Sequence, residues 1–170
     1  MNLWLTGDFH LNHRRILEYC NRPFKTIEEM NETIINNFNS KVEKHDQVIF
    51  LGDFCFGNPE PFLEKLNGDI VFLQGNHERG NRSVKTNITH LVLEIGNKEF
   101  YCTHKPEEYS SSYSINLVAH IHSNWQIKRI YNSYLINCGV DVWDYSPTSL
   151  AQILERLEIY KYNDKKSLNI

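Results

Sequence analysis

Carboxylate, imidazole and amide side chains recur in this chain at short spacings that suit metal coordination. Asp8 and His10 are two residues apart, as are His120 and His122. In an extended backbone, residues i and i+2 project to the same face, so each pair can reach one ion or two adjacent ions. Oxygen and imidazole donors together favour borderline divalent metals such as Mn, Fe, Zn or Ni. The full set of candidate donors is Asp8, His10, Asp53, Asn76, His104, His120 and His122. Because these donors outnumber the needs of one ion, we expect two ions that share one carboxylate.

Each of these donors follows a short apolar run. The runs cover residues 3–6, 48–51, 70–74, 100–103 and 117–119. Short apolar runs bounded by glycine are typical of strands buried on both faces. Because ligands of open α/β sheets bind at the carboxyl ends of the strands, we expect these five strand ends to form one site.

Helical patterns separate the strands in the first half of the chain. Thr26 and Glu29 form a capping box before an apolar stripe, which predicts a helix that ends near residue 43. Shorter helices are expected over residues 14–19 and 59–66.

The later half is richer in strands, and a helix closes the chain. Gly96-Asn97 separates two strands over residues 91–103, and a second strand pair is expected over residues 127–136. Ser146 is expected to cap the last helix, and the serine-rich segment 107–114 to be a mobile loop. The residues therefore predict an α/β fold with a strand-rich later half, in a single domain over 1–170.

Length and composition narrow the functional classes. The 170 residues include 41% hydrophobic and 23% charged residues, which is ordinary for one globular domain. A net charge of −3 argues against a dedicated nucleic-acid binder, but bound cations would still attract an anionic substrate. The chain lacks a signal-peptide pattern and an apolar run long enough to cross a bilayer, so we expect a cytoplasmic protein without a membrane partner. The four cysteines are expected to be reduced thiols.

The donor motifs occur in an order that resembles the calcineurin-like metallophosphoesterases. That family carries D-x-H, G-D, G-N-H-D/E, a lone His and G-H-x-H. Here the motifs are Asp8-Phe9-His10, Gly52-Asp53, Gly75-Asn76-His77-Glu78, His104 and Ala119-His120-Ile121-His122. Residues 21–24, 137–143 and 146–150 look like a small bacterial and phage branch of the family. Two features depart from the pattern. Ala119 replaces a glycine, and the Asp-Arg that protein Ser/Thr phosphatases carry after the second motif is missing.

This resemblance implies a β-sandwich of two mixed sheets flanked by helices, with two metal ions at one edge. The first ion would bind Asp8, His10, Asp53 and His122, and the second would bind Asp53, Asn76, His104 and His120. Asp53 would bridge the ions, and a hydroxide between them would attack a phosphate ester. His77 is not needed as a ligand, so it would protonate the leaving oxygen.

The implied activity is that of a phosphodiesterase or broad phosphoesterase on small or nucleotide-like substrates. Two alternatives remain open. One is a nuclease, because the double-strand-break repair nuclease shares these motifs. The other is a non-catalytic interaction scaffold, for which the retromer subunit of this fold is the precedent. Monoester or diester preference, native metals and oligomeric state are not indicated by the sequence.

Several further residues lie near the motifs. His13, Arg22, Arg79 and Lys105 are candidate substrate contacts, and Arg14 and Arg82 are weaker ones. For each arginine and lysine, a solvated surface charge is the favoured interpretation, and a helix-start role competes for His13. Glu78 is expected to stabilise its turn, and Trp143 to pack in the core.

Overall fold

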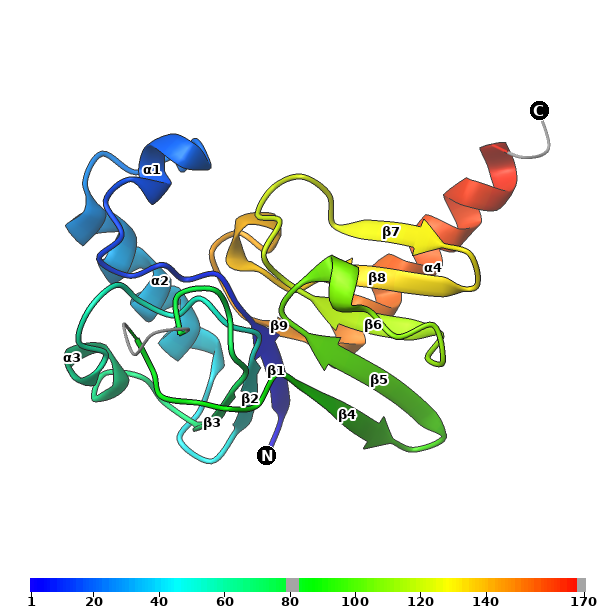
Figure 1. Cartoon of the computed structure of the whole chain (residues 1–170), viewed down its shortest axis with the longest axis horizontal. Helices are drawn as coiled ribbons and strands as arrows, with labels where there is room; N and C mark the ends of the chain where they lie inside the picture. The colour runs from blue at the N-terminus through cyan, green and yellow to red at the C-terminus, as the bar shows by residue number, and fades with distance from the viewer. Residues whose placement is uncertain (79–82, 168–170) are drawn as a thin grey trace.

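The computed structural model describes residues 1–78 and 83–167. Within them the strands form two mixed sheets (Figure 1). The first sheet contains β1 (Leu3–Thr6), β2 (Gln47–Phe50), β3 (Asp69–Phe72) and β9 (Thr148–Ser149), in the order β3-β2-β1-β9. The second contains β4 (His90–Ile95), β5 (Lys98–Thr103), β6 (Ile115–Val118), β7 (Ile127–Ile130) and β8 (Ser133–Asn137), in the order β4-β5-β6-β8-β7. The prediction of two mixed sheets is confirmed.

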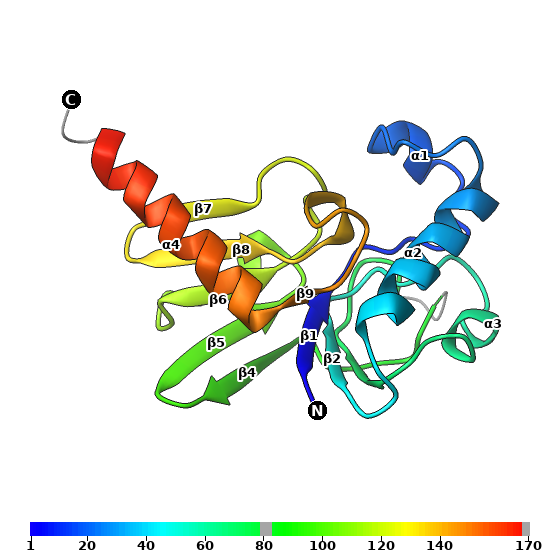
Figure 2. The ribbon, with the colours of Figure 1, turned by 180° about the vertical axis from the view of Figure 1, so that it is seen from behind.

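Helices cover the outer sides of the two sheets (Figures 1 and 2). Beside the first sheet lie α1 (Ile16–Tyr19), α2 (Ile27–Lys41) and α3 (Glu60–Leu63), and α4 (Leu150–Ser167) lies against the second sheet. Thr26 caps α2 as expected, because its side chain accepts a hydrogen bond from Glu29 N. No helix in the described part of the chain is both long enough and apolar enough to cross a bilayer.

The core has two parts because the middle strands of the first sheet, β1 and β2, pack side chains on both faces. Phe9, Phe38, Phe50 and Phe54 belong to the cluster between this sheet and α2, and their rings meet mostly edge to face. Alternate residues such as Leu5 belong to a second cluster, which also contains side chains from the second sheet and from α4. This packing fixes the ends of β1 and β2 from both sides.

The start of the last helix differs from the prediction. Ser146 does not cap it, because residues 148–149 form β9, which pairs antiparallel with Trp4 and Leu5 of β1. The helix begins at Leu150, and Ser149 Oγ accepts a hydrogen bond from Gln152 N at 3.3 Å. Local capping signals favoured the earlier start, but backbone pairing with β1 satisfies more polar groups.

The serine-rich segment is tied to the second sheet, contrary to the expected mobile loop. It begins with a 3-10 turn (Pro106–Glu108), and Ser110 N donates to the buried side chain of Asn116 at 2.8 Å. The Asn116 amide also donates to two carbonyls of the segment, those of Ser110 and Tyr113. The segment therefore covers the outer face of β6.

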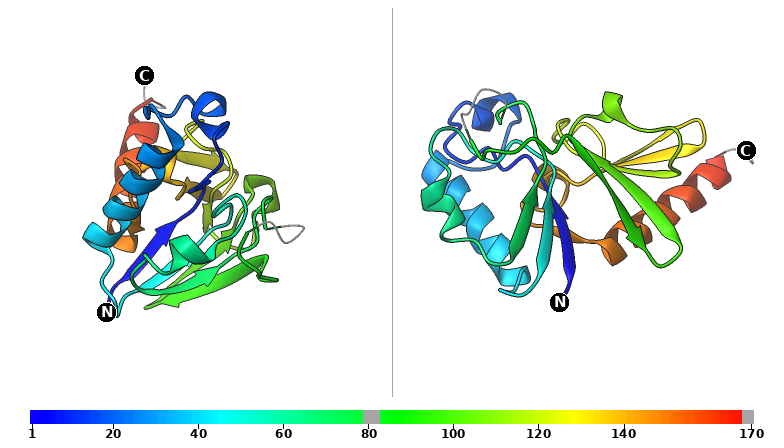
Figure 3. Two further views of the ribbon diagram at one scale, coloured as in Figure 1. Left: turned by 90° about the vertical axis from the view of Figure 1, so that its left-hand side faces the viewer. Right: turned by 60° about the horizontal axis from the view of Figure 1, so that its bottom comes forward.

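The loops that follow β1, β2, β3, β5 and β6 meet at one edge of the sandwich (Figure 3). Gly52 lies at this junction with φ +92°, and a Cβ there would lie 2.7 Å from Gly75 N and from His104 Nδ1. Gly57 has the same φ, but a Cβ there would have no neighbour within 4 Å. The two glycines thus share one backbone conformation and differ in the space around them.

This pair gives a stability prediction. Gly57→Ala should cost about 1–2 kcal/mol of unfolding free energy, which is the cost of a left-handed alanine. Gly52→Ala should cost roughly 1–3 kcal/mol more, because overpacking is added to the strain. Urea unfolding of both variants measures the difference. Equal losses in the two variants would show that Gly52 is not constrained by its neighbours.

Candidate metal centre

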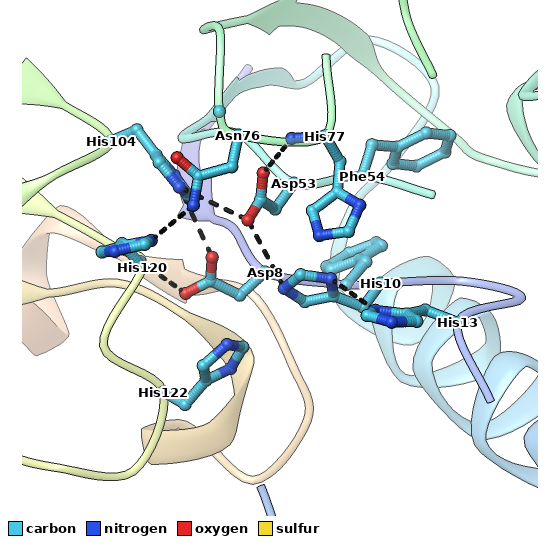
Figure 4. A network of polar contacts seen from close by, with 12 residues as sticks. Asp8, His10, His13, Asp53, Phe54, Asn76, His77, His104, His120 and His122 are labelled. Atoms are coloured by element: carbon cyan, nitrogen blue, oxygen red, sulfur yellow. Dashed lines mark hydrogen bonds and ion pairs between the residues drawn. The ribbon is translucent and has the colours of Figure 1, made fainter. Parts of the chain in front are cut away.

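The structure brings the seven predicted ligand residues to one place (Figure 4). They come from the ends of five strands: Asp8 and His10 after β1, Asp53 after β2, Asn76 after β3, His104 after β5, and His120 and His122 after β6. Asp8, His10, Asp53 and His104 are buried, whereas His120 and His122 are partly exposed and Asn76 is exposed. The expectation that five strand ends converge is confirmed.

The backbone route to this convergence differs from the predicted one. Asp8, His10, His120 and His122 have φ values of 56°, 53°, 74° and 49°. The two pairs are therefore not extended, and left-handed residues at alternate positions carry the side chains that gather at the site. Non-glycine residues adopt this conformation only when the surrounding structure imposes it, and such residues concentrate at functional sites. Asp53, with φ 60°, follows the same rule.

Asp53 stands at the centre of the cluster. Its Oδ2 lies 3.6 Å from His10 Nε2 and 3.4 Å from His104 Nε2. Its Oδ1 accepts a hydrogen bond from His77 N at 2.9 Å. One oxygen of the carboxylate is thus fixed by backbone, and the other faces two imidazole nitrogens.

Three buried polar atoms around this oxygen have no hydrogen-bond partner. They are Asp8 Oδ1, His10 Nε2 and His104 Nε2. Buried polar atoms without a partner are rare because each forfeits its hydration. His104 Nδ1 lies 2.6 Å from Leu51 O and therefore carries the donated proton in the neutral ring, which leaves an Nε2 lone pair facing a carboxylate. A cation between these atoms removes that conflict, so the donor set fits divalent metals.

The donors fall into two overlapping groups that share Asp53. Asp8, His10 and Asp53 form one group, and Asp53, His104 and His120 form the other. These two groups lie within the two ligand sets expected from the sequence. A third group, of His10, His13 and His77, shares His10 with the first and lies outside those sets.

Asn76 and His122, the remaining members of those sets, lie beside the groups. The Asn76 amide is 3.0 Å from His120 Nδ1, and the His122 ring centroid is 5.0 Å from that of His10. If the Asn76 amide were flipped, its oxygen instead of its nitrogen would face the site and could coordinate a cation.

Burial and charge perturb the titration of these groups. Burial raises the pKa of Asp8 to about 6, although His104 and His122 oppose the shift. Burial also acts to raise the pKa of Asp53, but the close imidazole of His104 holds it well below its usual range. For His104, burial acts to lower the pKa, yet Asp53 and Asp8 raise it to about 9. The two carboxylates thus require nearby positive charge, from a protonated imidazole or from a bound cation.

Arg22 is not the substrate contact that the sequence suggested, nor a solvated surface charge. Its side chain is fully buried and forms a bidentate pair with Asp141 at 2.9 and 2.8 Å. It also donates to Phe9 O and Asp8 O at 2.9 and 2.7 Å. Because the left-handed turn after β1 leaves these carbonyls without strand partners, a buried guanidinium with its five donors satisfies them.

Asp141 was missed as a functional residue by sequence reasoning. Its Oδ2 accepts a hydrogen bond from His122 Nδ1 at 2.9 Å, which fixes the orientation of the His122 ring beside the site. Burial acts to lower the pKa of His122, but the hydrogen bond to Asp141 and nearby carboxylates raise it to about 10. Asp141 is 119 residues from Arg22 in the sequence, so no local pattern could reveal that the two residues pair.

His13 and His77 lie on one side of the cluster. His13 Nδ1 is 3.4 Å from His10 Nδ1, and the His77 ring centroid lies 4.9 Å from that of His10 and 5.1 Å from that of His13. His13 also stacks on Phe56 with centroids 5.5 Å apart. His13 therefore faces the site, as one of its two predicted roles required.

The remaining candidates have simpler positions. Glu78 accepts hydrogen bonds from the backbone of Asp53, Phe54 and Gly75 at 2.8–3.0 Å, which confirms its role in the turn. Trp143 is buried and donates to Asn137 O, so it belongs to the core. Lys105 is partly exposed beside His104, and Arg14 is exposed. Arg79 and Arg82 lie outside the described residues.

Comparison with known proteins agrees with this site. Residues 1–163 match a family model described as calcineurin-like phosphoesterase. The chain belongs to this family. This calcineurin-like phosphoesterase is 36% identical over 169 residues to an uncharacterized protein of Methanocaldococcus jannaschii, and the match covers 92% of this chain and 91% of that protein.

Solved structures show the same fold. A protein of unknown function from Aquifex aeolicus, AQ665, has a TM-score of 0.72 at 19% identity, over 91% of this chain and 98% of that one. Vps29 of Chaetomium thermophilum has a TM-score of 0.50 at 10% identity, over 89% and 76% of the two chains.

The Asp141 contacts predict an effect on cation affinity. Asp141→Asn should weaken Mn²⁺ binding by roughly 10–100-fold, because a neutral amide orients and polarises His122 less well. Asp144→Asn, a change of the same chemistry at an exposed neighbouring position, is the control and should bind normally. Titration calorimetry measures both. Normal affinity in Asp141→Asn would show that the His122 contact does not support the site.

The raised pKa of Asp8 predicts a pH-dependent cost in the cation-free protein. Because the folded state holds this proton more tightly than the unfolded state, stability should fall as pH rises from about 4 to about 6. The loss should reach about 3 kcal/mol at most. Asp8→Asn should therefore be more stable than the native chain at pH 7 without cations, and the advantage should vanish near pH 4. Chemical unfolding in a chelator at both pH values tests this, and equal stability at pH 7 would contradict it.

Proposed function

We propose that this calcineurin-like phosphoesterase is a phosphodiesterase that uses two divalent cations to hydrolyse small or nucleotide-like substrates. The observation that carries the proposal is the group of unpartnered buried atoms, Asp8 Oδ1, His10 Nε2 and His104 Nε2, around Asp53. One cation would bind Asp8, His10, Asp53 and His122, and the other would bind Asp53, Asn76, His104 and His120. The donor types suit Mn, Fe, Zn or Ni.

When bound, the cations activate water and offset the charge that develops on the phosphoryl oxygens. The chain itself supplies rigid positions for them. Asp53 is held by His77 N through Oδ1, and Asp8 is held by His120 N through Oδ2 at 2.8 Å. Each carboxylate therefore keeps its other oxygen directed into the site without further rearrangement. Such preorganisation is a principal source of rate enhancement in hydrolytic sites.

His77 is the proposed general acid. Its side chain is partly exposed and belongs to neither of the two groups that share Asp53, although it forms a third group with His10 and His13. With the cations held by the two groups that share Asp53, His77 would be free to give a proton to a leaving oxygen. Its backbone N–H already holds Asp53, which fixes the start of the side chain relative to the carboxylate. In this proposal the His77 ring lies between the ligand cluster and the leaving group.

A small substrate is favoured over a long nucleic acid. The net charge of −3 supplies no general attraction for a phosphate backbone, whereas a compact anion needs only the local charge of bound cations. Salt dependence separates the two, because binding to a DNA backbone weakens steeply with salt.

The proposal is tested by turnover of chromogenic phosphomonoesters and phosphodiesters by metal-stripped protein, with Mn, Fe, Zn or Ni added back singly. Activity on diesters that depends on the added cation is expected. Absence of turnover with every cation would favour the interaction-scaffold alternative. Activity confined to DNA and abolished by moderate salt would favour the nuclease.

The role of His77 gives a separate prediction. His77→Ala should lower kcat by about 10²–10⁴-fold, the usual worth of a general acid, because the leaving oxygen would depart without a proton. Cation content measured by elemental analysis should not change. His45→Ala, at an exposed histidine just before β2 and thus at the opposite end of that strand from Asp53, is the matched control. A kcat for His77→Ala equal to that of the control would remove His77 from the reaction.

A further inference from the structure

A cavity of about 890 Å³ adjoins the histidine side of the candidate metal centre. Phe56 connects the two, because its ring lines the cavity and also contacts the histidines of the site. Pro59, Leu63 and Val84 provide further apolar walls. The volume lies within the usual range for sites that bind small molecules.

The order of the rings leads from the carboxylates to this cavity. His10 Nε2 lies 3.6 Å from Asp53, and the rings of His13 and His77 come next. Phe56 follows, with its centroid 5.5 Å from that of His13 and 6.1 Å from that of His77. A group bonded to an oxygen that receives a proton from His77 would therefore lie near Phe56.

We propose that this cavity binds the leaving group of the phosphoester and that the group carries a planar aromatic ring of the nucleoside class, stacked on Phe56. This inference rests on the proposed function and specifies its substrate. The phosphoryl group would lie at the ligand cluster, and the ring would extend past His77 into the cavity. Phe56 is thereby a substrate-binding residue rather than a core residue.

The exposure of Phe56 supports an aromatic partner. The ring is 45% exposed although the two residues before it, Phe54 and Cys55, are buried in the core. It stacks on His13 at an interplanar angle of 20°, so it is held as a flat platform rather than left to rotate freely. Flat aromatic platforms of this kind bind bases of any sequence, since every base has a π face.

The polar groups at the cavity favour a neutral ring over a second phosphate. Lys85 and Glu60 both line it, so their charges balance and an additional anion would gain no net attraction. Asn58 also lines the cavity and can exchange hydrogen bonds with ring heteroatoms. Apolar walls with a few polar groups are the usual composition of a site for a heteroaromatic ring.

The test uses adenosine and inorganic phosphate as separate probes of Mn²⁺-loaded protein. Each is measured as an inhibitor of the turnover of a methyl chromogenic diester, and adenosine binding is also titrated directly by calorimetry. In Phe56→Ala, adenosine should bind roughly tenfold more weakly or worse, because the stacking of one base contributes that much. Inhibition by phosphate should be unchanged. Phe56→Tyr should retain adenosine binding, and Tyr131→Ala, at an aromatic residue that is 87% exposed, is the control.

The outcomes separate this inference from the proposed function. The cavity assignment would be overturned if the native chain did not bind adenosine, or if Phe56→Ala bound it as tightly as the native chain does. Either result would count even if diesters are hydrolysed. Absence of turnover would overturn the proposed function, and the calorimetric titration would still decide whether the cavity binds the nucleoside. Loss of phosphate inhibition in Phe56→Ala would also count against the inference, because it would place the defect at the ligand cluster.

Discussion

Two carboxylates buried side by side constrain this structure more than any other feature. Asp8 and Asp53 lie beneath the protein surface, where an ionised group loses most of its hydration. Their mutual repulsion and the cost of burial are offset by one backbone N–H hydrogen bond to each carboxylate and by positive charge in the space between them. The imidazoles of His10 and His104 face that space with unpartnered nitrogens, so the arrangement is that of a candidate cation site with oxygen and nitrogen donors.

The loops around this charge are held by buried polar side chains in addition to backbone hydrogen bonds such as those from Asp8 N to Gly52 O and from His10 N to Asp53 O. The Glu78 carboxylate receives three backbone N–H groups and joins the loop after β3 to the loop after β2. The Arg22 guanidinium donates to two carbonyls of the turn after β1 and also pairs with Asp141, so it joins that turn to the loop after β8. Removal of either charge would leave polar groups buried without partners. These contacts explain how several left-handed residues persist in the site.

The site also has a direction. The ligand cluster occupies one end, His77 and His13 come next, and Phe56 leads to a largely apolar cavity. A polar end suited to a phosphoryl group and an apolar end suited to an attached ring match the two halves of a nucleotide-like ester. The fold and family indicate phosphoester chemistry, and the features beside the cluster set which esters would fit.

The sequence by itself determined the ligand types, their order, and the strand ends that carry them. Buried strands need continuous apolar runs, and a donor placed directly after each run must emerge at the same sheet edge, so local patterns suffice. The capping box of α2 and the turn role of Glu78 are local in the same way. Arg22 marks the limit of such local inference, because no neighbouring residue in the sequence indicated that its side chain is buried.

Only the tertiary structure paired Arg22 with Asp141, across 119 residues, and thereby showed how His122 is oriented. It also replaced the expected cap at Ser146 with pairing to β1 and replaced extended i, i+2 pairs with left-handed turns. These features depend on which distant backbone and side-chain groups meet in space. Hydrogen bonds and charge pairs of that kind have no signature in a local window, since either partner alone resembles an ordinary surface residue.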